Sequence, residues 1–161
     1  MEKTLAMKLL EGRKVKYELF EYPNTERDAE KIADYLGIPA AEVYKTLVVT
    51  RAKGKPILFM LAAARRLNLK KLAKGIGEKK LSLAKHAEAE KLTGLKVGGI
   101  SPLALLNKGF AIYIDKAGEQ CERVLISSGK KGVNLGVPVK DLVKITKAKF
   151  VDAGDLMSRI A

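Results

Sequence analysis

The hydrophobic residues of this chain recur in five segments at intervals of three and four positions, the spacing that places them on one face of a helix. The clearest segment spans residues 29–36 and stops before Gly37, and a glycine commonly ends a helix. Thr25 followed by Asp28 resembles a capping box ahead of this helix, and Pro39 favours a further helical turn after it. The other four helices are predicted over residues 3–12, 67–75, 84–93 and 139–145.

Shorter apolar runs predict strands. Residues 46–51 and 56–63 flank Lys53-Gly54, which is a signal for a hairpin, and both runs are apolar enough to be covered on two faces. Residues 128–136 contain glycines and lysines, and we expect a basic loop there. Further strands are predicted over residues 15–19, 110–114, 123–127 and 148–151. The pattern favours one α/β (α+β) domain over residues 1–161, built on a mixed sheet and without internal repeats.

The composition fits a folded domain that binds a polyanion. The chain has 161 residues, of which 47% are hydrophobic, and this length suits one compact domain with its own core. Lysine and arginine outnumber aspartate and glutamate by 31 to 18, which gives a formal net charge of +13. Such a charge attracts RNA, DNA or anionic lipid, although a lysine-rich surface without a partner would give the same count.

Few residues are available for metal or disulfide chemistry. Cys121 is the one cysteine and His86 the one histidine, which excludes an intramolecular disulfide and a Cys/His zinc site within the chain. No apolar run approaches the length of a membrane span, and the N-terminus lacks the pattern of a signal peptide. We therefore expect a cytoplasmic protein with no metal, no cofactor and no membrane partner.

Common catalytic motifs are also missing from the sequence. There is no Gly-x-Ser-x-Gly, no P-loop and no dinucleotide-binding fingerprint. His86 lies in a polar helical stretch, where a solvated surface histidine is the simpler interpretation. Cys121 at the start of a strand is more simply a small side chain without a catalytic role than a nucleophile. Any chemistry must then rely on lysine, hydroxyls, backbone amides and groups of the substrate.

Three segments could carry such chemistry. Lys45 begins an apolar strand, so its ammonium group could bind a phosphate or ester oxygen at a sheet end, or it could be one of many surface lysines. Paired glycines in residues 97–102 would let backbone N–H groups approach a ligand, or the segment could be an ordinary turn. Glycines and two lysines in residues 127–134 suit phosphate contact, or they form a solvated loop.

Taken together, these segments resemble a known family. VYKTL at 43–47, VGGISPL at 97–103 and SSGKKGVNL at 127–135 occur in the order and at the spacing of the YbaK/EbsC aminoacyl-tRNA deacylases, with LNLKK at 67–71 between them. The set is similar also to the editing domain inserted in bacterial prolyl-tRNA synthetases. Each motif alone is weak, whereas the ordered set is specific and the resemblance extends over nearly the whole chain.

The resemblance implies a mixed, partly barrel-like sheet surrounded by helices, and hydrolysis of the ester that joins an amino acid to tRNA. It implies that Lys45 engages the terminal phosphate and ribose, that backbone amides of the GGISP loop lie near the scissile carbonyl, and that no metal is needed. It also implies tRNA(Pro) as a partner and a transient complex with prolyl-tRNA synthetase. By this resemblance the catalytic residues are Lys45, Gly98, Gly99 and Ser101, the substrate-binding residues are Tyr22, Thr46, Ile100, Pro102, Ser128, Gly129 and Asn134, and Lys130 and Lys131 bind nucleic acid.

Two branches of this family differ in the nucleophile. In the cysteine-specific branch the substrate's own thiol attacks its carbonyl and releases a cyclic thioester, so the protein supplies positioning and charge stabilisation. In the alanine-specific branch a positioned water attacks. This chain has Asn134 where cysteine-type members often carry an acidic residue, and its segment between Tyr22 and Lys45 is short and lacks an expected aromatic residue. Both departures bear on which amino acid is selected.

The leading interpretation is a trans-editing deacylase that acts on mischarged Cys-tRNA(Pro). One alternative is a water-mediated deacylase of Ala-tRNA(Pro), and another is a non-catalytic module that holds tRNA or a tRNA synthetase. A third is non-specific binding to nucleic acid or anionic membrane through charge alone. The C-terminal DLMSRIA, residues 155–161, lies beyond the resemblance.

Overall fold

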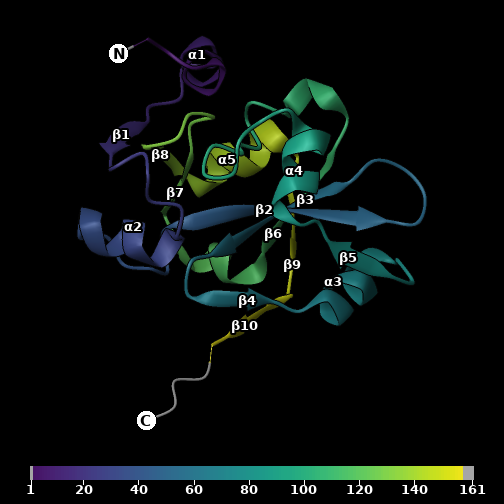
Figure 1. The fold of residues 1–161 in the computed structure, drawn as a ribbon. Helices are drawn as coiled ribbons and strands as arrows, with labels where there is room; N and C mark the ends of the chain where they lie inside the picture. Colours follow the sequence, from purple (N-terminus) through teal and green to yellow (C-terminus); the bar gives the residue numbers. More distant parts are fainter. Residues whose placement is uncertain (1, 158–161) are drawn as a thin grey trace.

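The fold is built around an antiparallel hairpin of two long strands, β2 (Tyr44–Arg51) and β3 (Ile57–Ala62), in a computed structural model that describes residues 2–157 (Figure 1). The α-helices are α1 (Leu5–Gly12), α2 (Ala29–Leu36), α3 (Leu69–Ile76), α4 (His86–Thr93) and α5 (Val139–Thr146). The other strands are β1 (Glu18–Glu21), β4 (Arg65–Leu67), β5 (Leu81–Leu83), β6 (Ala111–Asp115), β7 (Arg123–Ser127), β8 (Val133–Pro138), β9 (Lys149–Val151) and β10 (Gly154–Leu156). Two short 3-10 helices span Leu106–Lys108 and Lys116–Gln120.

The strands form three sheets. The largest has the order β5-β2-β3-β6-β9 and is mixed, because β3 and β6, and β6 and β9, pair in parallel while the other pairs are antiparallel. A second sheet has the order β1-β8-β7, and β10 pairs with β4 in a separate ribbon. A parallel bridge between Val43 and Leu125 links the two larger sheets. The expected mixed α/β domain is confirmed, with its strands divided among three sheets.

Strand β3 is buried along its whole length because both of its faces are covered. Leu58 and Met60 belong to the larger hydrophobic cluster, which includes residues of β7, β8 and α5. Phe59 and Leu61 point the other way, into a smaller cluster with Leu72 of α3. A strand covered on both faces reads as a continuous apolar run, which is the pattern seen in the sequence.

Most of the predicted elements are confirmed. The hairpin turns at Gly54, whose φ of +92° favours glycine, and all five predicted helices are present. Asp28 begins α2 by accepting hydrogen bonds from the N–H groups of Glu30 and Lys31, so the predicted capping role of Thr25 is wrong. Pro39 opens a turn closed by the N–H of Glu42, not a helix.

Five strands differ from the sequence prediction. Residues 128–136 were expected to form a loop, but residues 133–138 form β8, the middle strand of its sheet, because Val133, Leu135 and Val137 are buried. The helix expected from residue 67 begins only after Asn68, whose side chain accepts from the N–H of Lys71, and residues 65–67 form β4 instead. The short strands β5 and β10 were not predicted. Strand β1 begins at Glu18, three residues after the predicted start.

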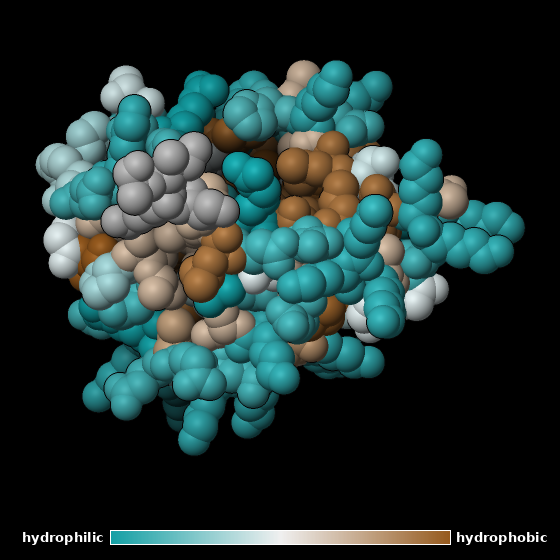
Figure 2. Space-filling view, turned by 90° about the horizontal axis from the view of Figure 1, so that it is seen from below, coloured by the Kyte–Doolittle hydropathy of each residue, from teal (hydrophilic) through white to brown (hydrophobic). Residues whose placement is uncertain are grey.

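Polar side chains cover most of one face of the molecule. Figure 2 shows a face that is largely hydrophilic around a smaller exposed hydrophobic area. Within residues 2–157, none of the helices combines the length and the apolar character that crossing a membrane requires. Residues 155–157 of the C-terminal segment include the end of β10, and residues 158–161 lie outside the described part of the chain.

Candidate active site

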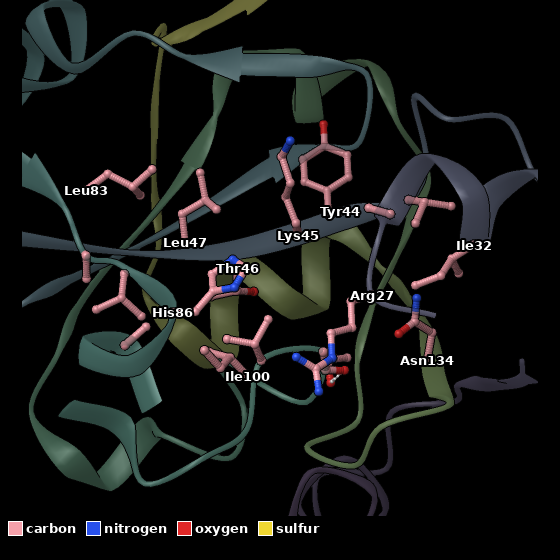
Figure 3. Close-up of a pocket in the computed structure, with 18 of the residues that line it drawn as sticks. Arg27, Ile32, Tyr44, Lys45, Thr46, Leu47, Leu83, His86, Ile100 and Asn134 are labelled. Atoms are coloured by element: carbon pink, nitrogen blue, oxygen red, sulfur yellow. Dashed lines mark hydrogen bonds between the residues drawn. The ribbon is translucent and has the colours of Figure 1, made fainter. Parts of the chain in front are cut away.

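A cavity of about 230 Å³ lies along β2 and collects residues from most of the motifs found in the sequence. Its walls come from the segment after β1, from α2, from β2, from the junction of β5 and α4, from residues 97–100, and from β7 and β8 (Figure 3). Its polar lining consists of Tyr22, Arg27, Tyr44, Lys45, Thr46, His86, Ser127 and Asn134. Its apolar lining includes Ile32, Leu47, Leu83, Ala89 and Ile100.

One edge of β2 is open where it borders this cavity. Along its other edge β2 pairs with β3. The Ala63 N–H donates to the Val43 carbonyl, so the backbone of Val43 is directed toward the β3 side. Because hydrogen-bonded pairs alternate along antiparallel strands, the N–H and C=O of Thr46 point away from β3. Strand β5 pairs with β2 only from Val49 onward, and a bond from Ala84 extends this pairing to Val48. The backbone of Thr46 therefore faces the cavity.

The hydroxyl of Thr46 is a second polar group available in the cavity. Its Oγ1 is buried and has no hydrogen-bond partner among the residues that the structure describes. Buried polar atoms are rarely left unpaired, because the lost hydration costs free energy. The unpaired hydroxyl and the open strand edge leave polar groups of Thr46 free on the cavity side of β2.

Lys45 borders the same cavity from the opposite face of β2. Figure 3 shows its side chain on the same side of the strand as Leu47, whereas Thr46 points to the other side. The Nζ donates hydrogen bonds to the main-chain oxygens of Arg65, at 3.1 Å, and Ala63, at 3.5 Å. An ammonium group has three donors, so one remains for a ligand. Partial burial lowers the pKa of Lys45, and the negative charges of Glu30 and Asp28 act in the opposite direction.

The acceptors of Lys45 are themselves held in place by a buried carboxylate. Asp115 is 1% exposed, and its Oδ1 accepts from the N–H groups of Ala153, at 3.1 Å, and Gly154, at 2.8 Å. Arg65 donates to the main-chain oxygen of Gly154 at 2.8 Å, and its Nε lies 4.0 Å from Oδ2 of Asp115. The main chain of Arg65 that receives Lys45 is thus connected to the core through Asp115.

Tyr22 and Asn134 form one wall of the cavity. Both side chains are buried, and the Tyr22 hydroxyl donates to Oδ1 of Asn134 at 3.4 Å. The N–H of Tyr22 donates to the main-chain oxygen of Gly132 at 2.9 Å, so the residue is fixed at both ends. Burial raises the pKa of the Tyr22 phenol, so it stays neutral and remains a donor.

The GGISP segment contributes only part of its length to the cavity lining. Gly98 and Ile100 line the cavity, whereas Gly99, Ser101 and Pro102 are buried behind them. The Gly99 N–H already donates to the main-chain oxygen of Lys96 at 2.7 Å, and the Ser101 hydroxyl accepts from the Ala104 N–H at 3.4 Å. Gly98 has a φ of +93°, a conformation that favours glycine.

The basic loop between β7 and β8 lies against the GGISP segment. A Cβ at Gly99 would lie 3.2 Å from the main-chain oxygen of Gly129, so the two backbones touch. Ser128 is fully buried, and its hydroxyl accepts from the Lys130 N–H at 3.2 Å, which closes a turn. Ser128, Gly129, Lys130 and Lys131 do not line the cavity, and Lys130 is exposed.

Arg27 and Ser127 line the cavity, and sequence reasoning missed both. The Ser127 hydroxyl donates to the Gly98 oxygen at 3.4 Å and accepts from the Gly129 N–H at 3.2 Å, which joins the two loops. It adjoins the predicted Ser128 in the same motif, and of these two serines it is Ser127 that lines the cavity. Arg27 lies in an exposed polar segment before α2 and gives no signal in the sequence. His86 is exposed, as expected, yet it also borders the cavity.

Cys121 lies away from this cavity. It lines a different hollow, with Glu42, Arg65 and Arg123, and its thiol donates to the main-chain oxygen of Ala41 at 3.5 Å. Burial raises the pKa of the thiol, which lowers its thiolate fraction at neutral pH. Within residues 2–157, no three histidine, cysteine, aspartate or glutamate side chains are grouped so that they could hold a metal ion.

Comparison with known proteins places this geometry in a family. The family model described as an aminoacyl-tRNA editing domain matches residues 24–145. EbsC of Enterococcus faecalis, assigned as a Cys-tRNA(Pro)/Cys-tRNA(Cys) deacylase, is 32% identical over 153 residues, which are 94% of this chain and 93% of EbsC. A proline–tRNA ligase of Thermodesulfovibrio yellowstonii is 34% identical over 82 residues, which are 51% of this chain and 14% of the ligase.

A solved structure agrees with these sequence matches. The crystal structure of a protein assigned as a trans-editing enzyme for prolyl-tRNA synthetase superposes with a TM-score of 0.79 at 26% identity, covering 96% of this chain and 99% of the other. The matched region of the family model contains Lys45, Thr46, the GGISP segment and Asn134. The chain belongs to the aminoacyl-tRNA editing domain family.

Proposed function

We propose that this protein is a trans-editing deacylase that removes cysteine from mischarged Cys-tRNA(Pro). The observation that carries the proposal is the meeting of Lys45, the open Thr46 edge and Gly98 in one small cavity of an editing-family domain. The name of EbsC supports cysteine and tRNA(Pro) as the substrate, since that relative matches over almost the whole chain. The proposal includes a cytoplasmic location, where tRNA is charged, and a transient complex with prolyl-tRNA synthetase that would supply the substrate.

The proposed reaction uses the thiol of the substrate as the nucleophile. Its sulfur forms a bond to the carbonyl carbon, the ester C–O bond breaks, and the thiol proton passes to the departing 3′ oxygen, leaving tRNA and a cyclic thioester. The cavity lining then needs to supply orientation and stabilisation of the negative charge on the carbonyl oxygen. This assignment accounts for a cavity whose lining has neither a cysteine nor a carboxylate.

Each lining residue has a role in this proposal. Lys45 holds the terminal ribose and phosphate with the donor that Arg65 and Ala63 leave free. The N–H and hydroxyl of Thr46, together with the backbone of Gly98 and Ile100, face the carbonyl oxygen.

The other predicted site residues would shape the cavity or contact the rest of the tRNA. Gly99, Ser101, Pro102, Ser128 and Gly129 shape the two loops behind the cavity, and Tyr22 and Asn134 form the wall that selects the amino acid. Lys130 and Lys131 lie on the loop outside the cavity, where they would contact the nucleic acid.

Deacylation of Cys-tRNA(Pro) and Ala-tRNA(Pro), measured side by side, tests the proposal. Rapid loss of cysteine alone supports it, and Cys-tRNA(Pro) with an S-methylated cysteine should then be stable, because its sulfur cannot attack as a thiol. Loss of alanine would instead assign the water-mediated reaction. Retained tRNA binding without loss of either amino acid would assign a non-catalytic module.

The Lys45→Ala variant provides the residue-level control. Without the lysine charge the terminal ribose and phosphate are no longer held in place, so kcat/KM should fall by a factor of about 100, as when a reacting group is misplaced by about 1 Å. Lys70→Ala is the matched control, since Lys70 is an exposed lysine of α3 that does not line the cavity. Equal activity in both variants would remove Lys45 from the mechanism.

A further inference from the structure

Three cationic side chains from separate segments meet around Gly98, at the mouth of the cavity. A Cβ at Gly98 would lie 3.8 Å from Cγ of Arg27 and 3.8 Å from Cγ of Lys131, so the stems of both side chains flank this glycine. Lys96 lies two residues before Gly98, and its Nζ is 3.9 Å from Oε1 of Glu90. Arg27 and Ile100 both line the cavity (Figure 3).

The positive charge of this cluster is only partly balanced. Glu90 is the carboxylate that the three cations share, and its Oε2 is already occupied by the Val97 N–H at 2.8 Å. That hydrogen bond, followed by the charges of Lys96, Arg27 and Lys131, lowers the pKa of Glu90, which keeps it ionised. Within residues 2–157, neither Arg27 nor Lys131 has a carboxylate within 4.0 Å of its charged group. Two of the three cations are therefore available to an external anion.

The cluster is also held at a fixed spacing. The backbones of Gly99 and Gly129 touch, and a Cβ at Gly99 would lie 3.4 Å from the Lys131 nitrogen. The Gly99 N–H bonds to the main-chain oxygen of Lys96, and the Ser127 hydroxyl bonds to that of Gly98. Lys96 and Lys131 thus project from two loops that are fastened together, which reduces the entropy lost when they bind a ligand.

The size of the cavity determines which part of a substrate reaches this cluster. A cavity of about 230 Å³ is smaller than a typical pocket for a drug-sized ligand, so it accommodates an amino acid and part of a ribose. The remaining nucleotides of a charged RNA must lie outside, and their phosphates pass the mouth of the cavity. An arginine fork and a lysine are the side chains that suit phosphate oxygens.

We propose that Arg27 and Lys131, assisted by Lys96, form a clamp for the phosphodiesters just upstream of the terminal nucleoside of a single-stranded RNA end. This inference rests on the proposed function and extends it, because it gives Arg27 and Lys96 a role and separates recognition of the RNA strand from reaction at the ester. The clamp contributes to affinity for RNA and leaves the reacting groups in the cavity unchanged.

The test compares two substrates in the Arg27→Gln/Lys131→Gln double variant. One substrate is Cys-tRNA(Pro), and the other is the cysteine ester of adenosine, which has no upstream phosphodiester. On the tRNA, the kcat/KM of the variant should fall about tenfold, mainly because KM rises. The slope of log KM against log salt concentration should decrease by about 1.4, which is about 0.7 for each lost phosphate contact. Its loss of kcat/KM on the adenosine ester should be clearly smaller than its loss on the tRNA, because that ester has no upstream phosphodiester for the clamp to bind.

A matched control removes the same charge elsewhere. Lys140→Gln/Lys144→Gln neutralises two exposed lysines of α5, a helix that contributes nothing to the cavity lining. It should stay within twofold of the wild type on both substrates. An equal loss on the tRNA in the control would mean that only total charge matters, and an equal loss on both substrates in the Arg27/Lys131 variant would place these residues at the ester. Either result overturns the clamp.

The clamp can be judged even if the proposed function fails. If the wild-type protein deacylates neither substrate, the deciding measurement is the binding of a short single-stranded RNA ending in CCA, followed by fluorescence anisotropy. About tenfold weaker binding in the Arg27/Lys131 variant, with an unchanged control, supports the clamp. Equal binding by the wild type and the variant refutes the clamp. So does a wild-type protein that binds duplex RNA more tightly than single-stranded RNA and a variant that has lost this preference.

Discussion

The Tyr22 hydroxyl donates to Oδ1 of Asn134 at 3.4 Å, and this bond joins residues 112 positions apart in the sequence across one wall of the cavity. Tyr22 follows β1 and Asn134 lies in β8, and the two strands pair directly. Both side chains are buried, so neither can exchange this bond for water without a local opening. The bond therefore affects both the stability of the sheet and the shape of the cavity.

A double-mutant cycle measures the strength of this bond. Tyr22→Phe removes the donor and leaves the Asn134 oxygen buried without it, which should lower the free energy of unfolding by about 0.5–1.5 kcal/mol. Asn134→Ala should cost more, since it also removes buried volume. The double variant should be less destabilised than the sum, with a coupling energy of about 1 kcal/mol in denaturant unfolding. Strict additivity would show that the two groups do not interact in solution.

The Lys45 charge should reduce the stability of the fold while serving the reaction. Burial lowers the pKa of Lys45, so the folded chain holds this proton less tightly than the unfolded chain. Lys45 therefore destabilises the fold most at a pH below its pKa in both the folded and the unfolded chain. This cost decreases as the pH rises from the pKa of the folded chain to the pKa of the unfolded chain. Lys45→Met keeps the apolar stem and removes the charge.

Thermal unfolding at two pH values checks this expectation. Lys45→Met should be at least as stable as the wild type at pH 7, and its advantage should shrink at pH 10. The same substitution at exposed Lys70 of α3 is the control for the loss of a positive charge. If Lys45→Met unfolds at a lower temperature than the wild type at pH 7, the hydrogen bonds to Ala63 and Arg65 outweigh the cost of burying the charge.

The contact between the two glycine loops should be sensitive to a single methyl group. Gly99→Ala places a Cβ 3.2 Å from the Gly129 oxygen, so the loops must separate by a few tenths of an ångström. Because small displacements at a reaction site are costly, kcat/KM for deacylation should fall about tenfold while the protein remains folded. Gly12→Ala is the control, because a Cβ at Gly12 meets nothing within 4 Å. Alanine in place of glycine in a helix is favoured by about 0.5–1 kcal/mol, so this variant should stay folded.

A buried carboxylate should support the lysine from a distance. Asp115→Asn leaves the side-chain volume unchanged but replaces one acceptor oxygen with an N–H₂ group. This new donor then faces other donors, either Arg65 or the N–H groups of Ala153 and Gly154. The free energy of unfolding should fall by about 1–3 kcal/mol, because a buried bond is lost. Asp152→Asn, at an exposed carboxylate nearby, should change it by less than about 0.5 kcal/mol. Similar effects of the two variants would show that Asp115 does not anchor this region.

The sequence predicted the central hairpin and the helices well because their signals are local. The apolar runs on either side of Gly54 and the glycine that ends α2 each act within a few residues. Strand β8 was missed because Asn134 and Gly136 resemble a loop, and only its pairing with β1 and β7 makes it a strand. Strand pairing depends on residues far apart in the chain, and local propensity does not contain that information.

The candidate site shows the same division. The motif around Lys45 and Thr46 was found from its sequence, and both residues line the cavity. Arg27 gave no sequence signal, because its position at the mouth results from the path of the chain between β1 and α2. The hydrogen bond that occupies the Gly99 N–H also could not be foreseen, since it depends on how the loop closes onto Lys96.

Cys121 should be dispensable for the reaction. Burial raises the pKa of its thiol, so the thiolate needed for attack is scarcer at neutral pH than in an ordinary cysteine. It also lines a different hollow from the one that contains Lys45. Cys121→Ser should therefore deacylate Cys-tRNA(Pro) at the wild-type rate, within about twofold, as measured by loss of the labelled amino acid.

Chemical labelling gives an independent check of the same point. Iodoacetamide should modify Cys121 slowly at pH 7 and faster as the pH rises, because the raised pKa moves thiolate formation to higher pH. Partial modification should leave deacylation unchanged, since the reacting thiol belongs to the substrate. If Cys121→Ser were inactive although folded, or if activity fell in step with alkylation, the enzyme's own thiol would be the nucleophile and the substrate-thiol mechanism would be wrong.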